Sequence, residues 1–151
     1  MYTATTVLTI NAFVPMSGIV GQSPTINATI APPINTSVPP PNQATPVFTG
    51  DGQSITVTVP TGYTGAVELT YQLPDPRYVL LGLAFKSSIG GAGRLQFRTI
   101  VINRDPTGSQ LTVTDACVPA LDEIDYHYVI LVQEVDTGNI GLIDPDIDNE
   151  N

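Results

Sequence analysis

Apolar and polar residues alternate along short segments of this chain, and this alternation is its most regular feature. Apolar residues occupy every second position over 54–59 and over 67–73, with Ser, Thr, Glu and Gln between them. A period of two is typical of a β-strand that has one face in the core and the other in water. The same period predicts a strand over 5–14 and a weaker one over 25–30.

A second pattern, apolar on both faces, occurs in the middle of the chain. Residues 77–86 read Arg-Tyr-Val-Leu-Leu-Gly-Leu-Ala-Phe-Lys and lie between Pro76 and a glycine-rich run at 90–93. A short apolar run with these boundaries predicts a central strand rather than a helix. Strands are also predicted over 95–103 and 109–114, and no segment has a helical period. We therefore expect about eight to ten short strands and little helix.

The C-terminal part of the chain predicts a β-hairpin. Residues 136–139, Asp-Thr-Gly-Asn, supply the turn, and Ile140 and Leu142 belong to the returning strand, which runs into Asp144-Pro145. The apolar face of the first strand consists of Tyr126, Tyr128, Ile130 and Val132.

The start of this hairpin favours one class of β fold. Immunoglobulin-like sandwiches often have an Asp four residues before a tyrosine whose hydroxyl bonds back across a corner between strands. Asp122 and Tyr126 have this spacing. We therefore expect an all-β, immunoglobulin-like antiparallel β-sandwich with Asp122 and Tyr126 as its structural corner. An ordinary core strand without a corner is the alternative.

Length and composition indicate one folded domain. The chain has 151 residues, of which 42% are hydrophobic and 13% are charged, and this is enough to build a core without disulfides. We expect a single β-sandwich domain over 1–151. Within it, the prolines of 31–45 predict a loop, and 144–151 predicts a short acidic C-terminal tail.

The charge of the chain argues against two classes of partner. The net charge is −9, and the five basic residues are Arg77, Lys86, Arg94, Arg98 and Arg104. No Lys or Arg follows Arg104, whereas acidic residues do, so the C-terminal third would repel phosphates. We expect neither a nucleic-acid nor a membrane partner.

Two further features bear on the compartment. The single cysteine, Cys117, excludes an internal disulfide and a thiolate metal cluster, and its apolar neighbours predict a core position. The chain has no basic N-terminal segment followed by an apolar run, so a cytoplasmic protein is expected, or a secreted one if a signal was trimmed.

The acidic ending also raises the question of a metal site. The candidate calcium ligands alternate along the chain, so an extended segment would present them on one side: Asp144, Asp146, Asp148 and Glu150. The Gly and Glu that an EF-hand loop needs at its sixth and twelfth positions are absent. A solvated or strand-terminating tail and a partner-binding tail are the alternatives.

No pattern predicts catalysis or a bound cofactor. His127 is the only histidine, and no Gly-x-Ser-x-Gly sequence accompanies it, so a serine-type triad is disfavoured. The spacing of the acidic residues singles out no pair for glycoside hydrolysis. Tyr63, Tyr71 and Tyr78 could stack on a sugar, or could be core residues. We expect neither an enzyme nor a cofactor.

The C-terminus resembles a known family. The sequence Ile143-Asp-Pro-Asp-Ile-Asp-Asn-Glu150 follows a Tyr-x-Tyr-x-Ile-x-Val strand and a glycine-containing turn. In this it is similar to the DP-EP family of small uncharacterised bacterial proteins, which end in Asp-Pro, an Ile-x-Asn step and Glu-Pro. Asn151 stands where those proteins have the final proline. The resemblance implies an immunoglobulin-like sandwich and no known activity.

These observations lead to one functional expectation and one alternative. The leading hypothesis is a non-catalytic binding or structural module that associates with a protein partner or with itself through an edge strand. The apolar segments 79–85 and 95–102 motivate it, since such edges must be covered. The alternative is a Ca²⁺- or carbohydrate-binding domain that uses the acidic C-terminus or exposed tyrosines.

Overall fold

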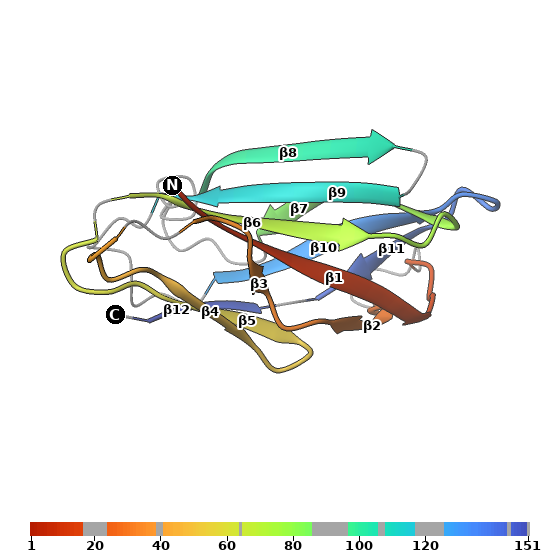
Figure 1. Cartoon of the computed structure of the whole chain (residues 1–151). Helices are drawn as coiled ribbons and strands as arrows, with labels where there is room; N and C mark the ends of the chain where they lie inside the picture. The colour runs from red at the N-terminus through yellow and green to blue at the C-terminus, as the bar shows by residue number, and fades with distance from the viewer. Residues whose placement is uncertain are drawn as a thin grey trace.

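The protein is all-β in the part of the chain that the structure describes. The structure is a computed structural model and describes residues 1–16, 24–38, 41–63, 65–85, 97–105, 108–116, 126–144 and 146–150. For 85, 97–100, 105, 126–127 and 146–150 only the backbone is described. These ranges contain twelve strands and no helix, so the all-β prediction is confirmed (Figure 1). The number of strands exceeds the expected eight to ten because short strands at 34–35 and 47–50 and a C-terminal strand were not predicted.

One six-stranded sheet contains the N-terminal strand. Its order is β2-β1-β6-β9-β8, and β3 pairs with β1 beside β2. The strands are β1 (Tyr2–Ala12), β2 (Asn27–Ile30), β3 (Ile34–Asn35), β6 (Val67–Leu73), β8 (Phe97–Asp105) and β9 (Gly108–Asp115). The segment 31–45, predicted as a Pro-rich loop, therefore contains the two-residue strand β3.

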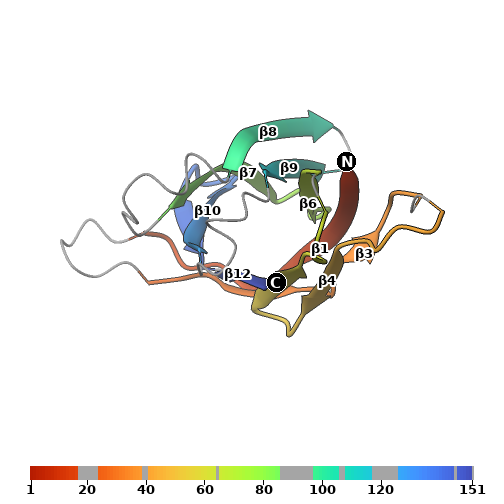
Figure 2. The same ribbon diagram turned by 90° about the vertical axis from the view of Figure 1, so that its left-hand side faces the viewer.

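The other six-stranded sheet contains the C-terminal hairpin. Its order is β11-β10-β12-β5-β4, and β7 pairs with β10. The strands are β4 (Val47–Gly50), β5 (Ser54–Thr58), β7 (Tyr78–Phe85), β10 (Tyr126–Glu134), β11 (Ile140–Ile143) and β12 (Asp146–Glu150). Figure 2 shows strands of both sheets on opposite sides of a common interior.

The sequence led us to expect antiparallel sheets, but each sheet contains one parallel pair of strands. β1 runs parallel to β6, with Tyr2 opposite Val67, and β12 runs parallel to β5, with Asp146 opposite Ser54. In both cases the first or last strand of the chain lies beside a strand that is distant in sequence. An alternating pattern specifies which face of a strand is buried and carries no information on the direction of its neighbour.

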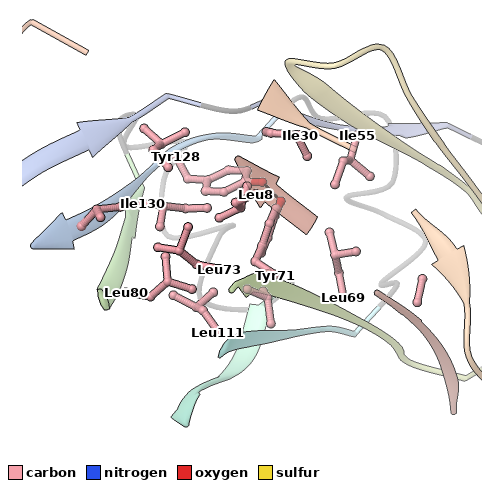
Figure 3. Close-up of a cluster of buried hydrophobic side chains, with 14 of the residues drawn as sticks. Leu8, Ile30, Ile55, Leu69, Tyr71, Leu73, Leu80, Leu111, Tyr128 and Ile130 are labelled. Carbon is pink, nitrogen blue, oxygen red and sulfur yellow. Dashed lines mark hydrogen bonds between the residues drawn. The ribbon is translucent and has the colours of Figure 1, made fainter. Parts of the chain in front are cut away.

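Buried side chains from both sheets form one core (Figure 3). Tyr71 of β6 and Tyr128 of β10 lie at its centre, with ring centroids 6.3 Å apart and a hydrogen bond between their hydroxyls. The other fully buried large side chains are Leu8, Ile30, Ile55, Val67, Leu73, Leu80, Leu111, Ile130 and Val132. The alternating positions of β5 and β6 thus bury the residues that the period of two assigns to the core.

The predicted C-terminal hairpin is confirmed. β10 and β11 pair antiparallel from Ile130 opposite Ile143 to Gln133 opposite Ile140. In the connecting turn, the Gly138 amide donates to the Glu134 carbonyl at 2.9 Å, and Gly138 has a φ of 71°. A positive φ of this kind is strained in residues with a Cβ, which explains the glycine.

The segment 144–151, predicted as a short acidic tail, contains a strand. Residues 146–150 form β12, which lies between β10 and β5 in the sheet. β5 pairs with all five of these residues and β10 pairs with Asp146 and Ile147, so their backbone has partners that the charge pattern did not reveal. The predicted corner cannot be placed in the same way, because Asp122 and the Tyr126 side chain lie outside the described residues.

Candidate functional site

The predicted calcium ligands are placed only in part. Asp144 is exposed at the end of β11. The backbones of Asp146, Asp148 and Glu150 are opposite Ser54, Thr56 and Thr58 of β5, and their side chains lie outside the described residues. Among the residues that are described, no group of three or more potential metal-binding side chains comes together. The calcium site stays a prediction.

Two of the three candidate sugar-binding tyrosines are structural. Tyr71 is fully buried, and burial raises its pKa well above the ordinary value, although the hydrogen bond with Tyr128 opposes the rise. Tyr78 is buried and stacks on Phe13, with ring centroids 5.5 Å apart, while the Arg77 guanidinium lies 5.3 Å from its ring centroid. Neither ring is available as an exposed platform. The single histidine, His127, lies in β10 by its backbone alone.

The third tyrosine, Tyr63, lines a pocket of about 680 Å³. Its hydroxyl donates to the Ala66 carbonyl at 3.1 Å, and its ring lies against Gly65. None of the side chains in the lining is charged: Met1, Tyr2, Val38, Gln43, Ala44, Thr45, Thr61, Gly62, Tyr63 and Gly65. The side chains of the pocket therefore offer amide and hydroxyl groups beside aromatic carbon, which suits a small polar ligand.

Backbone groups of other segments contact two of the sheet edges in the described part of the molecule. The edge of β11 receives hydrogen bonds from the Met16 amide to Ile140 at 2.8 Å and from the Ile26 amide to Leu142 at 2.6 Å. At the end of β2, the Ile30 amide donates to the Gly52 carbonyl at 2.9 Å. These contacts satisfy amides and carbonyls that would otherwise be available to another chain.

The edges of β4 and β7 are protected in different ways. β4 is only four residues long, and Pro33 packs against its last residue, Gly50. The Leu80 amide of β7 donates to the Ser109 hydroxyl of β9 at 2.9 Å, so β7 is tied to the facing sheet. Short length, proline and coverage are the usual ways in which proteins protect an edge.

β8 is the long edge strand that lacks such protection among the described residues. It has nine residues, pairs with β9 along one side, and ends the strand order of its sheet. Figure 1 shows it as the outermost strand at the top of the molecule. Val101 is 42% exposed and Arg104 is exposed, whereas Ile102 packs partly against the core. Among the described residues no strand pairs with the outer side of β8, so the exposed Val101 lies beside backbone groups that have no strand partner there.

The low charge of the segment 95–102 indicated an apolar strand. It did not indicate where that strand lies in the sheet. The apolar segments 79–85 and 95–102 gave the same signal, yet β7 is tied to β9 and β8 lies at an edge. The pocket around Tyr63 was missed altogether because its lining comes from separate loops and the start of β1. No pattern within one segment reports such a combination.

Comparisons with known proteins add no identification. No protein-family model, curated protein or solved structure matches this chain. Among the described residues, no helix is long and apolar enough to cross a membrane.

Proposed function

We propose that this protein is a non-catalytic binding or structural module that associates with a protein strand through the edge of β8. The strand comes from a second copy of the chain or from a protein partner. The observation that carries the proposal is the contrast between β8 and the other edges. β11 receives two backbone hydrogen bonds along its edge, β4 is short, and β7 is tied to Ser109, whereas β8 offers nine residues.

Strand addition is the binding mode that this surface supports. An extended segment can pair with the free backbone groups of an edge strand, while neighbouring side chains provide specificity. On β8 the exposed Val101 would contact an apolar side chain of the added strand, and the cationic Arg104 favours an acidic one. The charge of −9 on the whole chain makes this basic position unusual for the molecule.

Light scattering coupled to size-exclusion chromatography tests the proposal. We expect the mean mass of the wild-type protein to rise with protein concentration, and Val101→Lys to reduce that rise because a lysine opposes strand pairing at an edge. Val135→Lys is the matched control, since Val135 is 52% exposed in the β10–β11 turn. If Val101→Lys associates as the wild type does, β8 is not the contact. A strict monomer at high concentration would reject self-association.

The finer architecture is also part of the proposal. We infer an immunoglobulin-like sandwich from the two sheets around one core, from the buried Tyr128 on β10, and from the Asp122 and Tyr126 spacing. The resemblance of the C-terminus to the DP-EP family supports the same architecture. Substitution Asp122→Ala tests the corner: a loss of stability of about 1 kcal/mol or more is expected if Asp122 supports it.

The pocket around Tyr63 supports a second candidate function, the binding of a neutral carbohydrate. Its lining of amide, hydroxyl and aromatic side chains is the observation that favours a sugar. Calorimetric titration with a neutral oligosaccharide such as maltotriose should give heat that Gln43→Ala diminishes. Absence of heat with a panel of neutral oligosaccharides would remove this candidate.

A further inference from the structure

The C-terminal strand β12 holds together two parts of its sheet. It pairs with β5 at five positions and with β10 at two, where Ile147 is opposite Tyr126 and Asp146 is opposite His127. In the strand order of this sheet, β12 is the element between β10 and the β4–β5 hairpin. Among the described residues, removing β12 would therefore leave one edge of β5, together with Tyr126 and His127 of β10, without strand partners.

β12 is also a direct continuation of β11. Ile143 is opposite Ile130 and Ile147 is opposite Tyr126, so both strands keep one register along β10 across the Asp144-Pro145 step. Proline has no amide hydrogen to contribute to a ladder, and it favours an extended backbone in the residue before it. Two strands thus share one register along β10: an inner half, β11, which ends at Ile143, and an outer half, β12, which begins at Asp146.

We propose that β12 exchanges between two copies of this chain, so that the slot between β5 and β10 of one copy receives residues 146–150 of the other. The outer half can leave without breaking the β10–β11 pairing, because it pairs with Tyr126 and His127 of β10, whereas β11 pairs with residues 130–133. Its departure opens two edges at once, and another β12 restores the pairing of both in the register seen here. The exchanged dimer therefore keeps every strand pair of the single chain.

Concentration decides which form is populated. A short connection holds a strand near its own slot at an effective concentration of roughly millimolar, so the closed single chain is favoured in dilute solution. Exchange is expected when β12 is released at high protein concentration, as during refolding. The contact differs from the β8 edge, so this proposal does not depend on the proposed function.

A pair of single-cysteine chains tests the exchange. One full-length chain carries Thr56→Cys and the other carries Asp148→Cys, because these positions are opposite each other in the β5–β12 register. Cys117→Ser in both chains removes the native thiol. The two chains are mixed, partly unfolded in urea, and refolded together in an oxidising glutathione buffer. We expect a disulfide-linked heterodimer on a non-reducing gel, with a yield that rises with protein concentration during refolding.

Two controls make the result specific. A chain with both cysteines reports whether the bond can form within one molecule, and Val135→Cys mixed with Asp148→Cys measures random coupling, since Val135 is exposed in the turn. A heterodimer several-fold above this control supports exchange. If the double-cysteine chain closes its internal bond and the mixture yields no more heterodimer than the control, the proposal is overturned.

Native mass spectrometry supplies a measurement without cysteines. Unlabelled and ¹⁵N-labelled wild-type chains, refolded together at high concentration, should give mixed dimers that survive dilution, whereas monomers alone would overturn the proposal. The same experiment with Val101→Lys separates the two contacts. Mixed dimers that persist in Val101→Lys support exchange of β12, and mixed dimers that disappear assign the contact to β8 and overturn the exchange.

Discussion

The hydrogen bond between Tyr71 and Tyr128 provides the sharpest test of the core. Both side chains have 0% exposure, and their rings meet at 58° with centroids 6.3 Å apart. Replacing either tyrosine by phenylalanine keeps this ring contact and removes one hydroxyl from the pair. The three variants needed are Tyr71→Phe, Tyr128→Phe and the double variant.

The expected free energies follow from the burial of both hydroxyls. A single substitution removes a hydrogen bond and leaves the remaining hydroxyl without this partner in the core, which costs about 1–3 kcal/mol. In the double variant two aromatic rings of nearly the same shape meet, so its loss of stability should be smaller than the sum of the single losses. We expect a coupling free energy of about 1–2 kcal/mol between the two positions.

Urea unfolding followed by far-UV circular dichroism measures these values, because the substitutions would alter tyrosine fluorescence itself. Equal dependence of the unfolding free energy on urea in all variants would show that the denatured states are comparable. Tyr78→Phe is the matched control, since Tyr78 is buried against Phe13. Additive losses for Tyr71→Phe and Tyr128→Phe would refute the reasoning.

Three further predictions concern pH, backbone and surface charge. The raised pKa of Tyr71 means that the unfolded chain releases this proton first. The contribution of Tyr71 to stability should therefore be constant below about pH 10 and fall above it. Alkaline unfolding curves should show a smaller fall in Tyr71→Phe. Gly108→Ala should lower the stability of the protein by more than about 2 kcal/mol in thermal unfolding, because Gly108 has a φ of 142° and a Cβ there would meet the Leu73 carbonyl. Gly52→Ala should lower it by about 1 kcal/mol, because Gly52 has a φ of 100° but open space around it. Asp75→Asn removes the ion pair between the Asp75 carboxylate and Arg77, which are 2.6 Å apart. Because the pair is at the surface, the stability measured by urea unfolding should change by less than about 1 kcal/mol. A larger change would contradict this assignment of a surface pair.

Several strands could be predicted because their own residues record which face is buried. The alternation over 54–59 and 67–73 places Ile55 and Tyr71 in the core, and both are fully buried. The turn after β10 could be predicted from Gly138, since a positive φ there favours glycine. These are local properties, in which a residue and its near neighbours contain the whole signal.

The candidate sites were less predictable because each depends on contacts between distant segments. Tyr63, Tyr71 and Tyr78 are similar as residues, yet Tyr63 lines a pocket while the other two are buried. Likewise, one of the two apolar segments forms β7, which is hydrogen-bonded to β9, and the other forms β8, which lies at an edge. Exposure of a side chain or an edge is decided by what the rest of the chain packs against it.

The sequence by itself determined that this protein is built of β-strands, where several of them lie, and which residues of those strands face the core. Only the tertiary structure decided that β1 runs parallel to β6, that the acidic residues 146–150 form a strand between β10 and β5, and that β8 lies at an edge. The physical reason is that a period of two specifies the face of a strand, whereas its neighbour and direction depend on how strands far apart in sequence close one core.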